Sequence, residues 1–343
     1  MTLANGMAED GWDVTLVVLN LENAVYQYRL DPKLKLVNLH KGHARTALFA
    51  LWNYLLNARP ERILAFNHQL VILLILIRIF SFLRFSIISR NINTLSLLRE
   101  NESSLWHKYA VNYLVVLFYN KVDHVIAQSS GMKHDLVDYF GLNDDKITVI
   151  NNPINQNIES FVKDHDLSKI KKQDYLLCIG RLSKAKAFHF AIRSFAVILP
   201  EFPGLRLKIV GKGPMEMQLK ELAYDLGVFK NIDFEGFQPD VIPYYLNAKI
   251  TVLTSLFEGF PNVLVESIAL GTPVVAFNCS SGPSDIVQNG VNGFLVRYKD
   301  ITHLKECLRS ALTLKWDIHA INRSVLRYKS DAIITEYEKV ILK

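Results

Sequence analysis

Short apolar runs alternate with stretches of helical length along the first half of the chain. The runs fall at residues 14–19, 63–66, 85–89 and 124–127, and each is short enough to form a single strand. Strands that alternate with helices usually form a parallel sheet, because the crossover helices cover its faces. The pattern therefore predicts an α/β domain over residues 1–155.

A second series of the same kind follows a polar segment that is rich in charges and turn residues. We expect this polar segment, residues 156–173, to be a linker, and residues 174–328 to form a second α/β domain. The chain would then hold two consecutive doubly wound, Rossmann-like domains. The apolar runs of the second domain predict strands at 175–179, 206–210, 232–234, 250–254 and 274–277, with helices at 188–199, 214–226 and 261–270.

The most apolar segment is residues 70–88, where Arg78 and Arg84 interrupt the run. It therefore falls short of the roughly 20 clean residues that a membrane-spanning helix needs. Two interpretations stay open, namely a buried part of the first α/β core or an element in contact with a membrane surface. The acidic residues Glu9 and Asp10 near the start argue against a secretory signal.

Composition narrows the class of protein. Half of the 343 residues are hydrophobic, which is enough to fill two domain cores and excludes a disordered chain. The three cysteines are far apart and match no zinc-binding spacing, so we expect neither a disulfide framework nor a bound metal. These features indicate a protein of the reducing cytoplasm.

Positive charge is concentrated in the first domain. Residues 29–121 contain 13 lysines and arginines against 4 acidic residues, whereas the whole chain has a net charge of only +6. Nucleic acid, anionic lipid and phosphorylated substrates all suit such a surface. No zinc finger or aromatic RNA-binding motif accompanies the charge, so we expect no nucleic-acid partner.

The loops after the strands of the second domain carry the candidate chemistry, because doubly wound sheets bind ligands at the carboxyl ends of their strands. After the strand at 175–179, Gly180 and Arg181 open a turn that also contains Lys186. Cations in this position suit a phosphate, since arginine grips two oxygens and lysine adds a compact charge. This turn is a candidate phosphate site.

A second glycine turn, with Gly211, Gly213 and Pro214, follows the strand at 206–210. Its glycines allow close approach of the backbone, and its proline suits the first turn of a helix. The spacing matches neither the Walker loop nor the dinucleotide-binding pattern. A kinase or dehydrogenase is therefore disfavoured.

The most informative segment follows the strand at 250–254. Glu258 stands in a glycine turn, and Glu266 lies eight residues later, inside the helix that we expect to start near Pro261. Free amides at such a helix start attract anions, while carboxylates accept hydrogen bonds from hydroxyls. Cations, amides and two glutamates together indicate a nucleotide sugar as the ligand.

Five motifs resemble, in order and spacing, those of glycosyltransferase family 4. The likeness covers the second domain fully and the first domain loosely. It implies the GT-B fold, in which two Rossmann-like domains face a cleft and a C-terminal helix, here residues 329–343, crosses back to the first domain and packs across both. The motifs are Gly180-Arg181-Leu182 with Lys186, Gly211-x-Gly213-Pro214, Glu258-x7-Glu266, Gly271-Thr272-Pro273-Val274 and Asn289-Gly290-x-Asn292-Gly293.

The resemblance also implies roles for the site residues. Arg181 and Lys186 would hold the donor diphosphate in place of a metal ion, Glu266 would bind the ribose, and Glu258 would hold the transferred sugar. Transfer would retain the anomeric configuration and need no cofactor besides the nucleotide-sugar co-substrate, which we expect to be UDP-linked. The other donor-binding candidates are Gly180, Gly211, Gly213, Pro214, Ser255, Gly259, Phe260, Pro261, Asn262 and Val263.

The first domain departs from the family pattern. We expect its amino end to be truncated, because the chain opens on a segment that looks like the helix after the family's first strand and glycine-rich loop. The missing central strand would leave an unpaired position in the sheet. His68, Arg90 and Asn93 lie in loops of this domain and are candidates for contact with the acceptor or the sugar.

Together these features predict a glycosyltransferase of cell-surface glycan synthesis. We expect transfer of a hexose or N-acetylhexosamine to a lipid-linked or polysaccharide acceptor. The protein would be cytoplasmic and peripheral on the inner face of the cell membrane, with its basic domain against anionic lipid. The alternative is a catalytically impaired protein that binds nucleotide sugars without transferring them, because the amino-terminal loop is missing.

Overall fold

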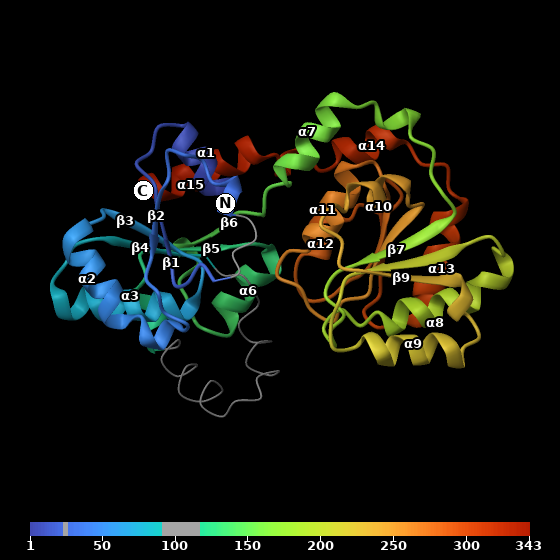
Figure 1. Ribbon diagram of the computed structural model, residues 1–343, viewed down its shortest axis with the longest axis horizontal. Coiled ribbons are helices and arrows are strands. Elements are labelled where there is room, and N and C mark those ends of the chain that lie inside the picture. Colours follow the sequence, from blue (N-terminus) through green and yellow to red (C-terminus); the bar gives the residue numbers. More distant parts are fainter. Residues whose placement is uncertain (23–26, 91–116) are drawn as a thin grey trace. The chain divides into compact units, whose positions relative to one another are not determined.

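The computed structural model describes residues 1–22, 27–90 and 117–343. The described chain forms two compact units, each with parallel strands and helices of its own (Figure 1). Unit 1 comprises Met1–Pro153 and Ser330–Lys343, and unit 2 comprises Ile154–Lys329. The last segment of the chain therefore belongs to the same unit as the first.

Unit 2 is built on one six-stranded sheet in the order β12-β11-β10-β7-β8-β9. Every pairing in it is parallel. All five strands that the apolar runs predict are present, and β12 at one edge is an additional strand. The strands are β7 (Tyr175–Ile179), β8 (Arg206–Val210), β9 (Ile232–Gly236), β10 (Ile250–Leu253), β11 (Val274–Phe277) and β12 (Gly293–Val296).

Helices cover both faces of this sheet. Leu177 of β7 belongs to the hydrophobic cluster on one face, and the adjacent Leu176 belongs to the cluster on the other, so the strand is buried on both sides. Burial on both sides explains why the fully buried central strands β7, β10 and β11 are nearly continuous apolar runs in the sequence. One face carries α8 (His189–Ile198), α9 (Glu216–Asp225) and α13 (Ile301–Thr313), and the other carries α7 (Gln156–Asp164), α10 (Ile242–Asn247), α11 (Asn262–Ala269) and α14 (Ile318–Arg323).

The polar segment 156–173, which we expected to be a linker, is part of unit 2. It contains α7, where Ile158 is buried and Phe161 and Val162 pack against the same hydrophobic cluster. These three residues have helical spacing, but polar neighbours obscure the pattern in the sequence. The chain passes from unit 1 to unit 2 earlier, after Pro153.

Unit 1 contains two parallel sheets, one with the pair β1-β2 and one with the order β3-β4-β5-β6. In the described part of the chain, no strand pairing joins the two sheets. The four strands predicted for this domain are present, and β2 and β6 are additional. The strands are β1 (Thr15–Val18), β2 (Lys35–Asn38), β3 (Arg62–Ala65), β4 (Ser86–Arg90), β5 (His124–Ala127) and β6 (Ile147–Val149).

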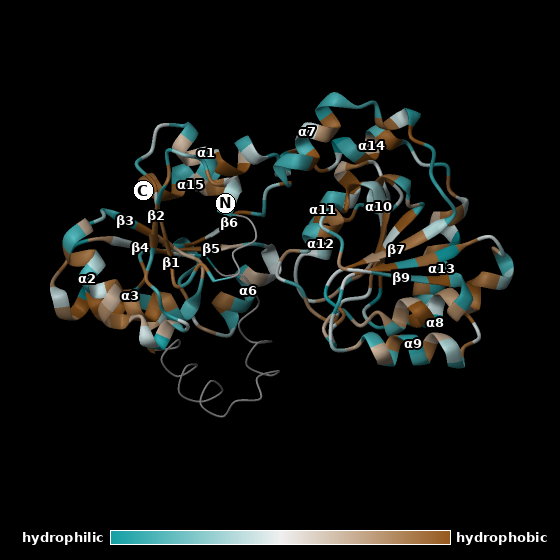
Figure 2. Cartoon of the chain, viewed as in Figure 1, coloured by the Kyte–Doolittle hydropathy of each residue, from teal (hydrophilic) through white to brown (hydrophobic). Residues whose placement is uncertain are grey.

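The apolar segment 70–88 forms most of α3 (His68–Ser81) and the start of β4. Val71, Ile75 and Ile77 of α3 are fully buried in the core of unit 1, and Figure 2 shows hydrophobic residues along this helix. The core interpretation is therefore correct for this part of the segment. Among the described residues, no helix combines the length and the hydropathy that crossing a membrane requires.

The final helix, α15 (Ser330–Leu342), packs on α1 (Thr2–Glu9) within unit 1. Ile334 of α15 lies so close to Gly6 that any side chain at position 6 would overlap it. Trp12 donates a hydrogen bond from Nε1 to Glu338 Oε1 at 2.7 Å. The helix thus returns to the first unit, which is the first part of what the family resemblance implies for it. Two further helices of unit 1 are α2 (Leu48–Ala58) and α6 (Ser130–Asp138).

Candidate active site

The candidate site lies where the strand order of unit 2 reverses. β7 and β10 are neighbours, but the chain runs from β7 to β8 and β9 on one side and from β10 to β11 and β12 on the other. The loops that leave their carboxyl ends therefore diverge, and doubly wound sheets bind ligands at such a switch point. Residues 180–187 follow β7, and residues 254–261 follow β10.

Lys186 and Glu258 meet at this switch point. Lys186 Nζ donates to Glu258 Oε1 at 2.5 Å, and the two side chains are only 21% and 13% exposed. The residues are 72 positions apart in the sequence, so the strand order is what brings them together. Arg181 of the same loop is exposed and forms no ion pair with the described residues.

The backbone conformation and close packing of the turns after β7 and β8 require glycine. Gly180 and Gly211 have φ values of 146° and 141°, which side chains rarely tolerate. A side chain on Gly211 would overlap the carbonyl of Gly180, and one on Gly213 would overlap the backbone of Leu182. The turns after β7 and β8 thus pack directly against each other. Pro214 is exposed in the turn before α9, which begins at Glu216.

The loop after β10 is mostly buried. Phe260 packs edge-on against Tyr328, with ring centroids 5.4 Å apart, and Gly259 and Pro261 are also buried. The Ser255 hydroxyl is buried too, and it has no hydrogen-bond partner in the part of the chain that the structure describes. The exposed Asn262 and the half-buried Val263 begin α11, one residue later than Pro261.

Glu266 lies in α11 and is held by a residue that the sequence did not single out. The fully buried Tyr245 of α10 donates from its hydroxyl to Glu266 Oε2 at 3.0 Å. Burial raises the pKa of the Glu266 carboxyl to about 7, although this hydrogen bond acts in the opposite direction. Tyr245 belongs to no motif and lies 21 residues earlier, so only the fold reveals it.

The small-residue loop after β11 closes on the loop after β10. Ser281 Oγ donates to the Gly259 carbonyl at 3.0 Å. Gly282 has a φ of 93°, and a Cβ there would lie 2.5 Å from Pro261 Cδ. The backbone of the Glu258 turn is therefore fixed from a second side.

The remaining candidates belong to unit 1. His68 is the first residue of α3, after the short turn of Phe66 and Asn67 that follows β3. Arg90 ends β4, where its Nε donates to Tyr337 Oη at 2.5 Å and its guanidinium lies 5.1 Å from the Phe66 ring centroid. Arg90 therefore takes part in the packing of unit 1. Asn93 lies outside the described residues.

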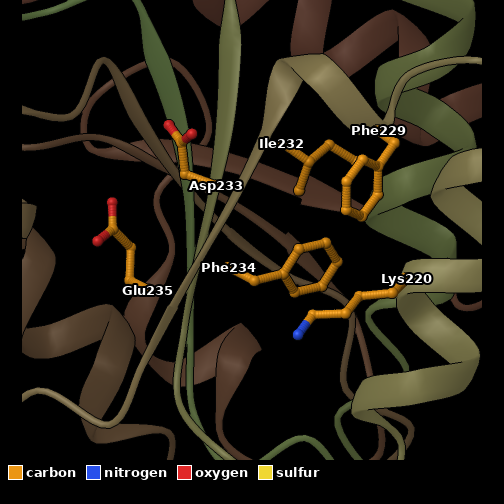
Figure 3. A pocket seen from close by; sticks show the side chains of 6 residues that line it. All are labelled: Lys220, Phe229, Ile232, Asp233, Phe234 and Glu235. Atoms are coloured by element: carbon orange, nitrogen blue, oxygen red, sulfur yellow. The ribbon is translucent and has the colours of Figure 1, made fainter.

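A pocket of about 430 Å³ lies elsewhere in unit 2, between α9 and β9 (Figure 3). Its carboxylates are already paired, since Asp233 accepts from Arg206 Nε at 2.9 Å and Glu235 accepts from Lys208 Nζ at 3.1 Å. It contains none of the predicted site residues. Its lining residues are Lys220, Phe229, Ile232, Asp233, Phe234 and Glu235.

Two family models match the chain. Residues 1–157 match the family described as Glycosyltransferase Family 4, and residues 161–327 match the family described as Glycosyl transferases group 1. The second match contains both loops of the switch point. The two matches together leave only short stretches of the chain uncovered.

Curated relatives are similar to the chain over much of its length. A glycosyltransferase of uncharacterised activity from Haemophilus influenzae is 28% identical over 316 residues, which cover 89% of this chain and 82% of the relative. The N-acetylgalactosamine-N,N'-diacetylbacillosaminyl-diphospho-undecaprenol 4-alpha-N-acetylgalactosaminyltransferase of Campylobacter jejuni is 29% identical, covering 63% and 56%. The capsular polysaccharide biosynthesis glycosyltransferase CapM of Staphylococcus aureus is 29% identical, covering 58% and 55%.

Solved structures show the same fold. The Anabaena protein HepE, in complex with UDP, superposes with a TM-score of 0.76 at 17% identity and covers 99% of this chain and 94% of its own. The two α/β units are thus those of the GT-B fold. With matches to both family models and this architecture, the chain belongs to the GT-B glycosyltransferases related to family 4.

Proposed function

We propose that the chain is a retaining, metal-independent glycosyltransferase that moves a hexose or N-acetylhexosamine from a UDP sugar to a lipid-linked or saccharide acceptor. The observation that carries the proposal is the Lys186–Glu258 pair at the switch point of unit 2. A cation suits the diphosphate of a nucleotide sugar, and carboxylates accept hydrogen bonds from its hydroxyls. The loops after β7 and β10 supply both.

The cations of the loop after β7 act on the leaving group. As the bond to the sugar breaks, negative charge grows on the diphosphate, and fixed positive charge stabilises it. Metal ions do this in many enzymes, whereas here Lys186 and the exposed Arg181 supply the charge. A bound diphosphate draws Lys186 away from Glu258, which then accepts hydrogen bonds from the hydroxyls of the transferred sugar.

The second carboxylate binds the nucleoside. Glu266 keeps part of its surface exposed, and Tyr245 fixes one of its oxygens, so the other can accept hydrogen bonds from the ribose hydroxyls. The pKa of about 7 means that the carboxyl gains its charge near neutral pH. Donor affinity should therefore increase as the pH rises from about 6 to 8.

The relatives support the classes of donor and acceptor. UDP is bound in the similar Anabaena structure. The relative from Campylobacter is named for a diphospho-undecaprenol acceptor, and the one from Staphylococcus aureus is named for capsular polysaccharide. We therefore place this chain in cell-surface glycan synthesis.

We also propose a cytoplasmic location with peripheral contact to the inner face of the cell membrane. Residues 29–121 carry an excess of nine positive charges, which anionic lipid attracts. Phe49, Phe80 and Phe82 of unit 1 are 81%, 66% and 89% exposed, and such side chains enter the headgroup region readily.

Sedimentation with vesicles tests this contact. We expect binding to phosphatidylglycerol and not to phosphatidylcholine, and equal binding to both would contradict a charge-driven contact.

Transfer itself is tested by incubating the protein with UDP-glucose, UDP-galactose and their N-acetylated forms, together with undecaprenyl diphosphate-linked sugars. We expect product with one of these pairs, with the anomeric configuration of the donor, in the presence of EDTA.

Glu258→Ala should reduce the rate by about 10- to 150-fold, the value of a charge-assisted hydrogen bond. An unchanged rate in this variant would contradict the proposed site. Donor binding without product under every condition would favour a protein that binds but does not transfer.

A further inference from the structure

Thr254 connects the two loops of the switch point through the backbone. It is the first residue after β10 and is fully buried. Its Oγ1 lies 3.1 Å from the carbonyl oxygen of Lys186 and 3.1 Å from that of Ala187, and the two carbonyls share its single hydroxyl proton in a bifurcated hydrogen bond. Two residues later, the Leu256 amide donates to the Ala185 carbonyl at 2.8 Å. The end of β10 thus holds three successive carbonyls of the loop that carries Lys186.

The segment that Thr254 holds has an unusual backbone conformation. Ala187 has a φ of 48°, a left-handed conformation that costs free energy in a residue other than glycine, and it is only 2% exposed. The Ala187 carbonyl also accepts from the Phe190 amide at 3.0 Å, where α8 begins. In the described part of the chain, however, the Lys186 carbonyl accepts only from Thr254.

We infer that Thr254 is a positioning residue that acts through Lys186. The inference rests on the proposed function, in which Lys186 stabilises the leaving diphosphate. Thr254 touches neither the donor groups nor Glu258 in this account. Its hydroxyl holds the two peptide units that follow Lys186, and the Leu256 amide holds the one before it. The ammonium group then reaches the diphosphate from a defined direction. Displacement of a catalytic group by about 1 Å can cost about 100-fold in rate.

Thr254→Val tests the inference, because valine has the same shape as threonine but no hydroxyl. We expect kcat to fall about 10- to 100-fold while the KM for the UDP sugar changes less than about threefold, since the contact to the diphosphate matters most in the transition state. Thr254→Ser keeps the hydroxyl and should retain kcat within about threefold. If the valine variant does not fold, Thr254→Ala gives the same comparison.

Thr251→Val is the matched control. Thr251 is also buried on β10, but its hydroxyl bonds to Ser267 Oγ at 2.8 Å instead of to the Lys186 loop. We expect this control to reduce stability in a similar way and to leave kcat within about threefold of the wild-type value. If Thr251→Val lowers kcat as much as Thr254→Val does, general destabilisation would explain the fall in kcat. That result would overturn the inference.

A double-mutant cycle with Lys186→Ala separates this inference from the proposed function. If Thr254 acts through Lys186, Thr254→Val should slow the wild type but not the Lys186→Ala variant. Equal slowing in both backgrounds, or slowing in neither, would overturn the positioning role alone. A Lys186→Ala variant with an undiminished rate would overturn the proposed function.

Discussion

The two units of this chain use the ends of their parallel strands differently. In unit 2, one continuous sheet reverses its order between β7 and β10, and the loops at that point bring Lys186 to Glu258. In unit 1, the described strands form two sheets, and Arg90 at the end of β4 bonds to Tyr337 of α15. The charged side chain at this strand end in unit 1 thus bonds within its own unit, whereas the pair in unit 2 is the proposed site of the donor.

This difference shows that the strand order of a sheet decides which residues of separate motifs meet. The loops that carry Lys186 and Glu258 meet, although the two residues are 72 positions apart, because β7 and β10 are neighbours. Substitutions at the switch point should therefore change catalysis and donor binding. Substitutions at the strand ends of unit 1 should change its stability and leave UDP affinity unaltered.

The largest expected effect is that of Lys186→Ala on transfer. Loss of the fixed charge on the leaving diphosphate should lower kcat about 100- to 1000-fold, as for other preorganised transition-state contacts. Steady-state kinetics with a UDP sugar measures it. Lys184→Ala, at an exposed position of the same loop, is the control and should stay within about threefold. Similar losses in both variants would mean that general charge, and not the switch-point geometry, drives the reaction.

Glu266 should make the stability of unit 2 depend on pH. Its folded-state pKa of about 7 lies above the ordinary value of 4.5, so the folded state holds a proton that the unfolded state releases. Stability is therefore expected to be full below about pH 4.5 and to fall as the pH rises through 7, by on the order of 3 kcal/mol at most. Urea unfolding at pH 5 and pH 8 measures it, and Glu266→Gln should remove this component. An unchanged pH dependence in the glutamine variant would contradict the assignment.

The packing of the glycine turns predicts a smaller loss of stability. Gly213→Ala should lower the free energy of unfolding by about 1–3 kcal/mol, because the new methyl group overlaps the backbone of Leu182. Gly204→Ala meets no atom within 4 Å and should change it by less than about 0.5 kcal/mol. Thermal unfolding of both variants measures the two losses of stability. Equal losses would contradict the close packing of Gly213 against the backbone of Leu182.

The smallest expected effect lies in unit 1. Tyr337→Phe removes the hydroxyl that accepts from Arg90 and should cost about 0.5–1.5 kcal/mol of stability. UDP affinity should not change, because neither residue belongs to unit 2. Calorimetry on the variant gives both quantities, and a large change in UDP affinity would remove the distinction between the two units.

Most strands could be predicted from the sequence because burial on both faces makes them continuous apolar runs, as at Tyr175–Ile179. The glycine and glutamate loops were also predictable, because turns and charged groups at strand ends follow simple rules. The helix α7 was not, since its three apolar residues stand among polar ones. The partners of Arg90 and Glu266 could not be predicted either, because Tyr337 and Tyr245 reach them only through the fold.

The central claim is that the switch point of unit 2 binds the diphosphate of a nucleotide sugar. Titration calorimetry of UDP into the wild type and into Lys186→Ala tests it most directly. The wild type should bind UDP, and the variant should bind it about 10- to 150-fold more weakly, the value of a charge-assisted hydrogen bond to phosphate. Equal affinity in the two proteins would contradict the claim.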